Sequence, residues 1–270
     1  MQQGKVLFMD LDDTLLSEDK SVSPKNRAAI ERALARGNSV VVTTGRPVKS
    51  GRKVVNELGL DGPGCYMIAF NGSVLYDCAA GQILQGKTVR LSYVKKLFEA
   101  AAKAGIYAQT YDREDVLAKQ YTKELAFYIK QTKMTYRLLP DLADALEEEP
   151  YKVLLICLEG REALEEFQRR NLFWSEGRLN SFFSNSAYLE YCPPGVDKGA
   201  AVLSFCKFFG IPLERTIAVG DEWNDVSMIR TAHVGVAVKN AVKAAKEAAD
   251  YVTERDHNHD AVAEVIERFL

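Results

Sequence analysis

The chain has 270 residues, of which 47% are hydrophobic and 27% charged, and its formal net charge is −2. This composition is typical of a globular protein, and the near-neutral charge gives no electrostatic case for nucleic acid or an anionic membrane as a partner. The five cysteines lack the spacing of a disulfide framework or a zinc site, so we interpret them as buried hydrophobic residues. No signal-peptide pattern and no apolar run of membrane-spanning length is found, which favours a cytoplasmic location.

Residues 6–16 begin as an apolar run of strand length and end in three carboxylates, Asp10, Asp12 and Asp13. In an open α/β sheet, ligands bind just beyond the carboxyl ends of the strands. Asp10 and Asp12 are two positions apart, so both side chains can face one small volume if strand geometry continues. Crowded carboxylates raise each other's pKa unless a cation lies between them, and Mg²⁺ would fill that role. A solvated acidic turn after a strand explains this stretch alone equally well.

Strands and helices then alternate along the first third of the chain. Ser23 and Pro24 predict the start of a helix that runs to about residue 36. The β-branched residues 39–43 predict a second buried strand, which stops at Thr44, Gly45 and Arg46. A right-handed connection would place the ends of these first two strands side by side.

A third apolar strand, residues 65–70, ends at Asn71-Gly72. Asn-Gly is a strong β-hairpin signal, so a turn is the favoured role of Asn71, ahead of a substrate contact. Short strands are predicted on the far side of this turn, at 74–76 and 82–84.

Residues 85–186 have a different character and predict a separate α+β domain. An amphipathic helix at 91–104 is followed by strands at 106–111 and 151–158. After Pro193-Pro194 the first pattern returns, with a helix at 198–209 and a strand at 216–219 that again ends in carboxylates. We therefore predict an α/β protein with a Rossmann-like, doubly wound parallel sheet as its core domain (1–84 and 187–270) and an inserted α+β cap domain (85–186).

Four polar clusters lie at predicted strand ends or helix starts. Each has a structural explanation when taken alone: Thr44 can cap a helix, Lys198 can be a solvated helix residue, and Asp221 and Asp225 can be charges favoured at a helix N-terminus. Together they supply a carboxylate nucleophile, a second carboxylate to move a proton, a metal site, and a hydroxyl and a cation for phosphate oxygens. This combination points to phosphoryl transfer.

The same clusters resemble the motifs of the haloacid dehalogenase (HAD) superfamily, in its Cof-like (IIB) phosphatase subfamily with a C2-type cap. Residues 10–14 match the DxDxT signature, and residues 41–46 resemble the second motif, with Thr44 as its hydroxyl. Residues 197–199 resemble the third motif, and residues 220–225 match GDxxND. The resemblance covers essentially the whole chain, with the four motifs in order and the insertion between the second and the third.

The resemblance implies a Mg²⁺-dependent phosphatase that forms an aspartyl-phosphate. Asp10 would be the nucleophile and a metal ligand, and Asp12 would be the general acid and base. The other implied metal contacts are the backbone carbonyl of Asp12, the carboxylate of Asp221, and Asp225 from behind the ligands or through water. No role for Asp13 is implied, and an exposed turn charge is the better interpretation.

The phosphoryl oxygens would be bound by Thr44, Lys198 and backbone N–H groups, including that of Gly45, with Asn224 as a further donor. Arg46 is left between a substrate contact and a salt bridge to the acidic cluster. His257 and His259 depart from the family's usual C-terminal pattern, and solvated loop histidines are favoured there over a metal site.

The substrates implied are small phosphorylated metabolites such as sugar phosphates, pyridoxal phosphate or flavin mononucleotide. A phosphomutase-like transferase on sugar phosphates is the alternative, although phosphomutases of this cap class would carry Val and Gly in place of Leu11 and Asp13. A non-catalytic binding module on the same fold is disfavoured because Asp10, Asp12 and Asp221 are all present. Neither the oligomeric state nor the cap residues that contact substrate follow from the sequence.

Overall fold

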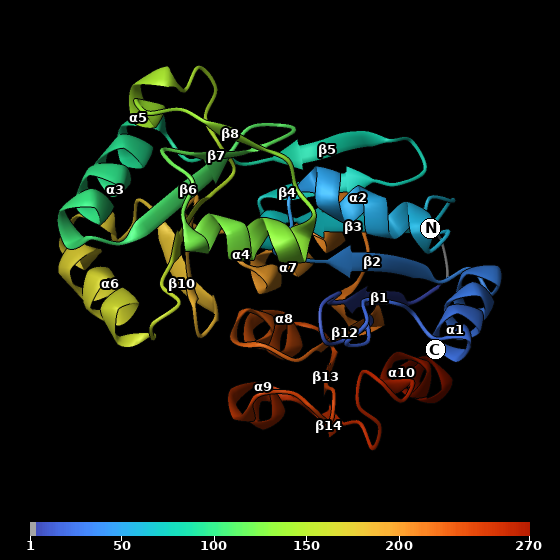
Figure 1. Cartoon of the computed structure of the whole chain (residues 1–270). Helices are drawn as coiled ribbons and strands as arrows, with labels where there is room; N and C mark the ends of the chain where they lie inside the picture. The colour runs from blue at the N-terminus through green and yellow to red at the C-terminus, as the bar shows by residue number, and fades with distance from the viewer. Residues whose placement is uncertain (1–3) are drawn as a thin grey trace. The chain divides into compact units, whose positions relative to one another are not determined.

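The computed structural model describes residues 4–270, which form two compact units (Figure 1). Unit 1 contains the described part of Met1–Gly45, together with Gly51–Gln85 and Asp197–Leu270, and unit 2 contains Arg46–Ser50 and Gly86–Val196. The short segment Arg46–Ser50 belongs to unit 2 because it packs there: the Ser50 hydroxyl donates to the Thr132 carbonyl oxygen at 3.0 Å. At the other boundary, the Asn180 amide donates to the Val196 carbonyl oxygen at 2.7 Å, which holds residues up to 196 on unit 2.

Unit 1 is built on an eight-stranded sheet, and its strand order explains where a site can form. The order is β14-β13-β12-β1-β2-β3-β4-β5. After β1 the chain adds β2 to β5 on one side of this strand, and later adds β12 to β14 on the other side. β1 pairs in parallel with both neighbours. The gap between β1 and β12 is therefore the switch point of a doubly wound sheet, as predicted from the sequence. The strands are β1 (Val6–Met9), β2 (Ser39–Thr43), β3 (Cys65–Ala69), β4 (Val74–Asp77), β5 (Gln82–Gly86), β12 (Thr216–Gly220), β13 (Val234–Ala237) and β14 (Tyr251–Val252).

The central strands are apolar because helices cover both of their faces. Every residue of β1, β2 and β12 is buried, which is why these strands read as continuous hydrophobic runs and not as alternating patterns. Successive side chains of β1 point to opposite faces of the sheet. Phe8 packs in the core cluster formed with α7. Elsewhere in the unit, α1 and α10 pack against each other. The helices and short turns are α1 (Pro24–Ala35), α2 (Val48–Glu57), η1 (Phe70–Gly72), α7 (Lys198–Phe209), η2 (Leu213–Arg215), η3 (Trp223–Asp225), α8 (Val226–Thr231), α9 (Lys243–Ala248) and α10 (Ala261–Phe269).

Phe205 on α7 anchors the helix that carries Lys198 to the sheet. Its ring is fully buried and meets the rings of Phe8 and Tyr66 edge-on, each at 5.3 Å between centroids. We expect Phe205→Ala to lower the free energy of unfolding by about 3–5 kcal/mol, because it removes a large buried ring and leaves a cavity. Leu203→Ala on the same helix is the matched control, since Leu203 is 52% exposed and should cost less than about 1 kcal/mol. Urea unfolding measures both, and equal losses would contradict this account of the core.

Unit 2 is an α+β unit with a six-stranded sheet of order β10-β11-β9-β6-β7-β8. Apolar side chains of β9 and β11, including Leu155 and Leu189, face a core made with α3 and α6. The opposite face is more polar and meets α4, where Tyr128 lies against Tyr111 and Tyr188. The elements are α3 (Leu91–Ala104), β6 (Tyr107–Tyr111), β7 (Val116–Ala118), α4 (Lys123–Thr132), β8 (Tyr136–Leu138), α5 (Leu142–Ala145), β9 (Val153–Ile156), α6 (Glu162–Ser175), β10 (Asn180–Asn185) and β11 (Tyr188–Cys192).

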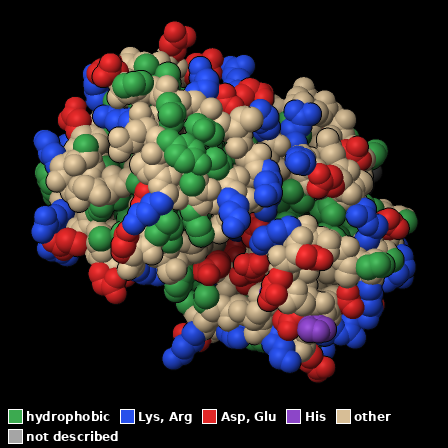
Figure 2. All heavy atoms as spheres, in the orientation of Figure 1, with side chains coloured by type: hydrophobic (Ala, Val, Ile, Leu, Met, Phe, Trp, Pro, Cys, Tyr) green, Lys and Arg blue, Asp and Glu red, His purple; other side chains and the backbone are tan. Residues whose placement is uncertain are grey.

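The surface charge is mixed. Figure 2 shows acidic and basic side chains interspersed over the face in view, consistent with the net charge of −2. Within residues 4–270, no helix has the length and apolar character needed to cross a membrane.

Candidate active site

The carboxyl ends of three neighbouring strands of unit 1 each deliver a polar residue. Asp10 follows β1, Thr44 follows β2 and Asp221 follows β12. The strands are in register, with Met9 opposite Val219 on one side and Val42 on the other, so the three residues emerge at the same level of the sheet. The backbone N–H of Asp10 donates to the Val219 carbonyl oxygen at 3.0 Å, which continues the β1–β12 ladder to the catalytic candidate itself.

Lys198 enters the same place from the start of α7. Asp197 caps this helix, with its carboxylate accepting the backbone N–H of Ala200 at 2.8 Å, and Lys198 is the first helical residue. Its ammonium donates to Asp10 Oδ1 and to Asp225 Oδ1, both at 2.5 Å. The side chain is 1% exposed, so Lys198 is a buried cation between two carboxylates and not the solvated helix residue that the sequence also allowed.

The acidic loop after β12 is folded around Asp225. Asp225 Oδ2 accepts the backbone N–H groups of Asp221 and Glu222, each at 3.0 Å. This requires glycine at the end of β12, because a Cβ on Gly220 would lie 2.5 Å from the Cγ of Asp225. Asp221 Oδ1 in turn accepts a hydrogen bond from the Thr14 hydroxyl at 2.7 Å. Asp221 is therefore fixed through its backbone N–H and its Oδ1, which leaves its Oδ2 for another partner.

Burial dominates the electrostatics of this cluster. The pKa of Asp10 is raised to about 8: desolvation is the largest cause, Lys198 opposes the shift, and Asp225 and Asp12 contribute to it. Burial likewise raises the pKa of Asp221 well above its ordinary value, with Asp10 and Asp225 adding to the shift. The pKa of Lys198 is raised: burial opposes this, but Asp10 and Asp225 outweigh it. Three buried carboxylates around one ammonium leave two negative charges uncompensated when all are ionised.

These residues fit a divalent cation. Asp10, Asp221 and Asp225 are buried, and one carboxylate oxygen from each lies within 4.8 Å of the others. Both oxygens of Asp225 are already engaged, whereas Asp10 Oδ2 and Asp221 Oδ2 accept no hydrogen bond from residues 4–270. Two hard oxygen ligands with two excess negative charges suit Mg²⁺, which binds few protein carboxylates and keeps several waters. Asp225 would act by holding the loop and Lys198.

Asp12 and Asp13 lie outside this buried cluster. The side chain of Asp12 is 39% exposed and forms a salt bridge with Lys20 at 3.2 Å, and Asp13 forms one with the same lysine at 3.3 Å. Asp13 has a left-handed backbone conformation, with φ at 58°, which agrees with its interpretation as a turn residue. The three carboxylates of the first motif therefore occupy different surroundings, and only Asp10 is buried among the other acids.

A second polar group, on the β2 side, involves Thr44, Gly45, Asn71 and Asn224. Thr44 is 1% exposed, and its carbonyl oxygen accepts the backbone N–H of Asn71 at 3.0 Å. Asn71 forms the predicted turn between β3 and β4 with φ at 55°, yet its side chain is fully buried. Its side-chain carbonyl oxygen accepts a hydrogen bond from the Asn224 amide at 2.9 Å, while its own NH₂ has no acceptor among residues 4–270. A Cβ on Gly45 would lie 3.1 Å from this amide, so glycine there makes room for Asn71.

The two loop histidines lie outside these groups, and Arg46 is assigned to the other unit. Arg46 belongs to unit 2, where its charge lowers the pKa of Tyr128, although burial outweighs it and leaves that pKa well above the ordinary value. His259 pairs with Asp256 at 2.6 Å. Among residues 4–270, the one cluster of candidate metal ligands is the Asp10–Asp221–Asp225 group. The expectation of solvated histidines is wrong for His257, whose two ring nitrogens are buried and have no hydrogen-bond partner within the described residues.

Two residues of the site escaped the sequence reasoning. Thr14 was read only as part of a motif, but its hydroxyl orients Asp221 across 207 positions of sequence. Lys20, in a polar loop, meets both Asp12 and Asp13. The threonine in the motif was a usable signal for the first contact, whereas nothing in the sequence distinguishes Lys20 from other loop lysines.

The doubly wound sheet, its acidic strand ends and the buried lysine beside them form the arrangement that the HAD motifs predict. The chain belongs to the haloacid dehalogenase-like hydrolase family, whose model matches residues 7–266. It is 26% identical over 268 residues to the 5-amino-6-(5-phospho-D-ribitylamino)uracil phosphatase YcsE of Bacillus subtilis, covering 98% of this chain and 96% of that protein. It is 27% identical to YitU, a phosphatase of the same organism named for the same substrate, covering 98% of this chain and 97% of that protein.

Solved structures agree with this assignment. A haloacid dehalogenase-like hydrolase from Bacteroides thetaiotaomicron is similar with a TM-score of 0.89 and 28% identity, covering 99% of this chain and all of that one. A HAD subclass IIB sugar phosphatase has a TM-score of 0.84 at 24% identity, covering 98% of each chain, and supports the fold alone. The protein is therefore a hydrolase of the HAD superfamily.

Proposed function

We propose that the protein is a Mg²⁺-dependent phosphatase that hydrolyses small phosphorylated metabolites through an aspartyl-phosphate on Asp10. The observation that carries this proposal is the buried Asp10 carboxylate, which Lys198 holds by Oδ1 while Oδ2 accepts no hydrogen bond from residues 4–270. A nucleophile needs an oriented, ionised carboxylate. Lys198 opposes the rise in the Asp10 pKa that burial causes, and a bound Mg²⁺ would lower that pKa further.

The reaction would proceed in two displacements. Asp10 attacks phosphorus through one carboxylate oxygen as the bond from phosphorus to the ester oxygen breaks, and Asp12 gives its proton to the leaving alkoxide. Asp12 then takes a proton from water, whose oxygen attacks phosphorus and releases inorganic phosphate and free Asp10. The exposure of Asp12 suits this role, because its proton must be exchanged between substrate and water in each cycle.

Other residues of the site would bind and orient the phosphoryl group. Thr44, Lys198 and the backbone N–H of Gly45 are the proposed contacts to its oxygens, with Asn224 and the NH₂ of Asn71 as further donors. Asp221, with Asp10 and the carbonyl oxygen of Asp12, would hold Mg²⁺, and Asp225 would keep Asp221 and Lys198 in position. Bound Mg²⁺ would supply the positive charge that balances the carboxylates and the phosphoryl oxygens.

The proposed substrate class is a phosphate monoester of a small polyol or sugar, with or without an attached ring. The relatives YcsE and YitU are named for a substrate in which a phosphorylated ribityl chain is attached to a uracil ring. Unit 2 would act as the cap that selects the alcohol portion, with Arg46 as a proposed substrate contact. A metabolite panel assayed for phosphate release with Mg²⁺ tests this. Formation of an isomerised sugar phosphate without free phosphate would instead establish the phosphotransferase alternative.

Metal dependence provides a direct test of the carboxylate site. Release of phosphate from an aryl phosphate should fall by at least about 100-fold in EDTA and return with excess Mg²⁺. Mg²⁺ at about 100 times its dissociation constant should also stabilise the protein by about 2.7 kcal/mol, measured by urea unfolding. Asp221→Asn should remove most of that stabilisation, whereas Asp61→Asn, in an exposed loop, should retain it. Full activity in EDTA would contradict the proposal.

A further inference from the structure

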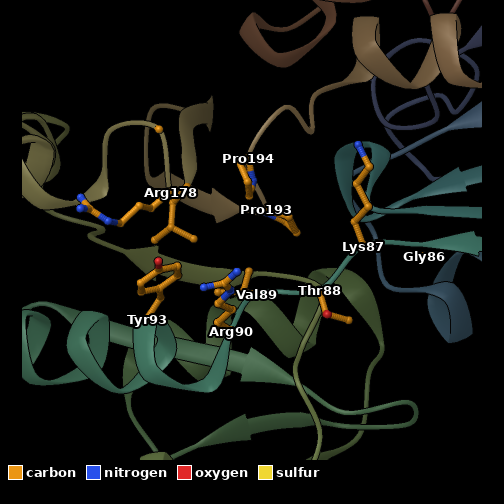
Figure 3. Close-up of a pocket in the computed structure, with 11 residues that line it drawn as sticks. Gly86, Lys87, Thr88, Val89, Arg90, Tyr93, Arg178, Pro193 and Pro194 are labelled. Carbon is orange, nitrogen blue, oxygen red and sulfur yellow. The ribbon is translucent and has the colours of Figure 1, made fainter.

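Unit 2 contains a pocket of about 440 Å³ that the chemistry of the active site does not use. It is lined by the segment that opens the unit, Gly86–Arg90, by the segment that closes it, Pro193–Pro194, and by Arg178 and Leu179 after α6 (Figure 3). Tyr93, in the first turn of α3, forms part of its floor. The volume is within the range of pockets that bind small metabolites and is much larger than a single inorganic ion requires.

The lining is positively charged. Lys87, Arg90 and Arg178 all contribute to it, and no aspartate or glutamate does. Figure 3 shows Arg90 in the middle of the pocket, near the Tyr93 ring and facing Pro193 and Pro194, with Lys87 and Arg178 at opposite ends of the view. Among the described residues, one carboxylate, that of Glu149, is hydrogen-bonded to a lining side chain, accepting a hydrogen bond from the Thr88 hydroxyl. Three cations without an acid among them favour an anionic occupant.

These cations have no protein counterion. The structure records no salt bridge for Lys87, Arg90 or Arg178 within residues 4–270, although most other unit 2 arginines are paired with acids. Arg178 uses one N–H to donate to the Trp174 carbonyl oxygen at 2.7 Å, and Arg90 lies 5.9 Å from the centre of the Tyr93 ring. Most of their donors are thus available to a ligand, and guanidinium groups bind phosphate in a bidentate manner.

The remaining lining is apolar and flat. The Tyr93 ring lies on one side of the space and Pro193 and Pro194 on the other. Val89 and Leu179, which also line the pocket, are buried. Such surfaces suit a planar ring, because ring packing on aromatic and proline faces removes apolar area from water. We propose that this pocket binds a phosphorylated metabolite of mononucleotide size, with its phosphate on Arg90 and its ring between Tyr93 and the two prolines, while Lys87 adds positive charge at one end of the pocket.

The test is a binding measurement on the full chain, with AMP as the probe and EDTA present so that hydrolysis is suppressed. Isothermal titration should give saturable binding of one AMP at this site, with a dissociation constant at least tenfold lower than for adenosine or inorganic phosphate. The double variant Lys87→Gln with Arg90→Gln should raise the AMP dissociation constant at least tenfold. The pair Lys103→Gln with Lys119→Gln removes the same charge from exposed positions of unit 2 outside the pocket and should leave binding unchanged.

Unchanged AMP binding in the Lys87/Arg90 variant, or no saturable binding to the wild-type chain, would overturn the proposal. Citrate binding in place of AMP would also overturn it, in favour of a carboxylate ligand. Arg90→Gln alone, with its unfolding midpoint measured, separates lost binding from lost folding. Because the readout is binding without turnover, these outcomes do not depend on whether the proposed phosphatase mechanism is correct.

Discussion

Asp10→Asn is expected to lower phosphate release from an aryl phosphate by at least about 1,000-fold, because it removes the proposed attacking oxygen and no other described carboxylate occupies its place. The change preserves shape, and it removes one charge from a cluster that burial already disfavours. The variant should therefore fold, with a free energy of unfolding equal to or above that of the wild type. Initial rates with saturating Mg²⁺, together with urea unfolding, measure the two effects.

Asp13→Asn is the matched control for Asp10→Asn. It is the same substitution three positions away, on a side chain that is 53% exposed and outside the buried cluster. Its activity should stay within about threefold of the wild type, since an exposed ion pair contributes little. Substantial activity in Asp10→Asn, or an equal loss in Asp13→Asn, would refute the assignment of Asp10 as the nucleophile.

Lys198→Met is expected to destabilise the protein strongly. The ammonium is the only cation within hydrogen-bonding distance of both Asp10 and Asp225 among residues 4–270, and all three groups are buried. Removing one partner of a buried ionic network leaves uncompensated charge, so we expect the free energy of unfolding to fall by about 3–5 kcal/mol in EDTA. Activity should be lost as well. Urea denaturation followed by circular dichroism measures the change.

Two further variants make the Lys198 prediction specific. Lys207→Met on the same helix, an exposed site, should change stability by less than about 0.5 kcal/mol. Adding Asp10→Asn to Lys198→Met should recover at least about 1 kcal/mol, because one of the stranded charges is then absent. A loss below about 1 kcal/mol in Lys198→Met, or strict additivity in the double variant, would show that the lysine does not compensate these carboxylates.

Much of the fold could be predicted from local patterns. The buried strands of unit 1 carry unbroken apolar runs, and helix starts such as Ser23-Pro24 and Asp197-Lys198 carry their own capping residues. The short elements of unit 2 between Val116 and Ala145 were not resolved from the sequence, because three- and four-residue elements show no periodicity. The grouping of Arg46–Ser50 with unit 2 was also missed, since it depends on packing against α4 and not on local composition.

Buried polar pairs were harder to foresee than strands. Lys152 and Glu190 lie next to or within apolar strands of unit 2, and each taken alone suggests an exposed edge. In the structure they form a buried salt bridge at 2.8 Å, with the lysine 5.3 Å from the centre of the Tyr111 ring. Their partnership depends on the antiparallel pairing of strands that are far apart in the sequence, so no local pattern predicts it.

The sequence by itself determined the inventory of the active site: acidic residues at two strand ends, a threonine at a third, and a lysine at a helix start. Local patterning suffices for this, because strand and helix boundaries are encoded within a few residues. The tertiary structure alone decided how the inventory is arranged. Parallel pairing of β1 with β12 brings Lys198 to Asp10 across 188 positions and places Thr14 on Asp221, while the turn after β1 directs Asp12 and Asp13 to Lys20. Contacts between such distant residues depend on the register of the whole sheet, which local sequence does not specify.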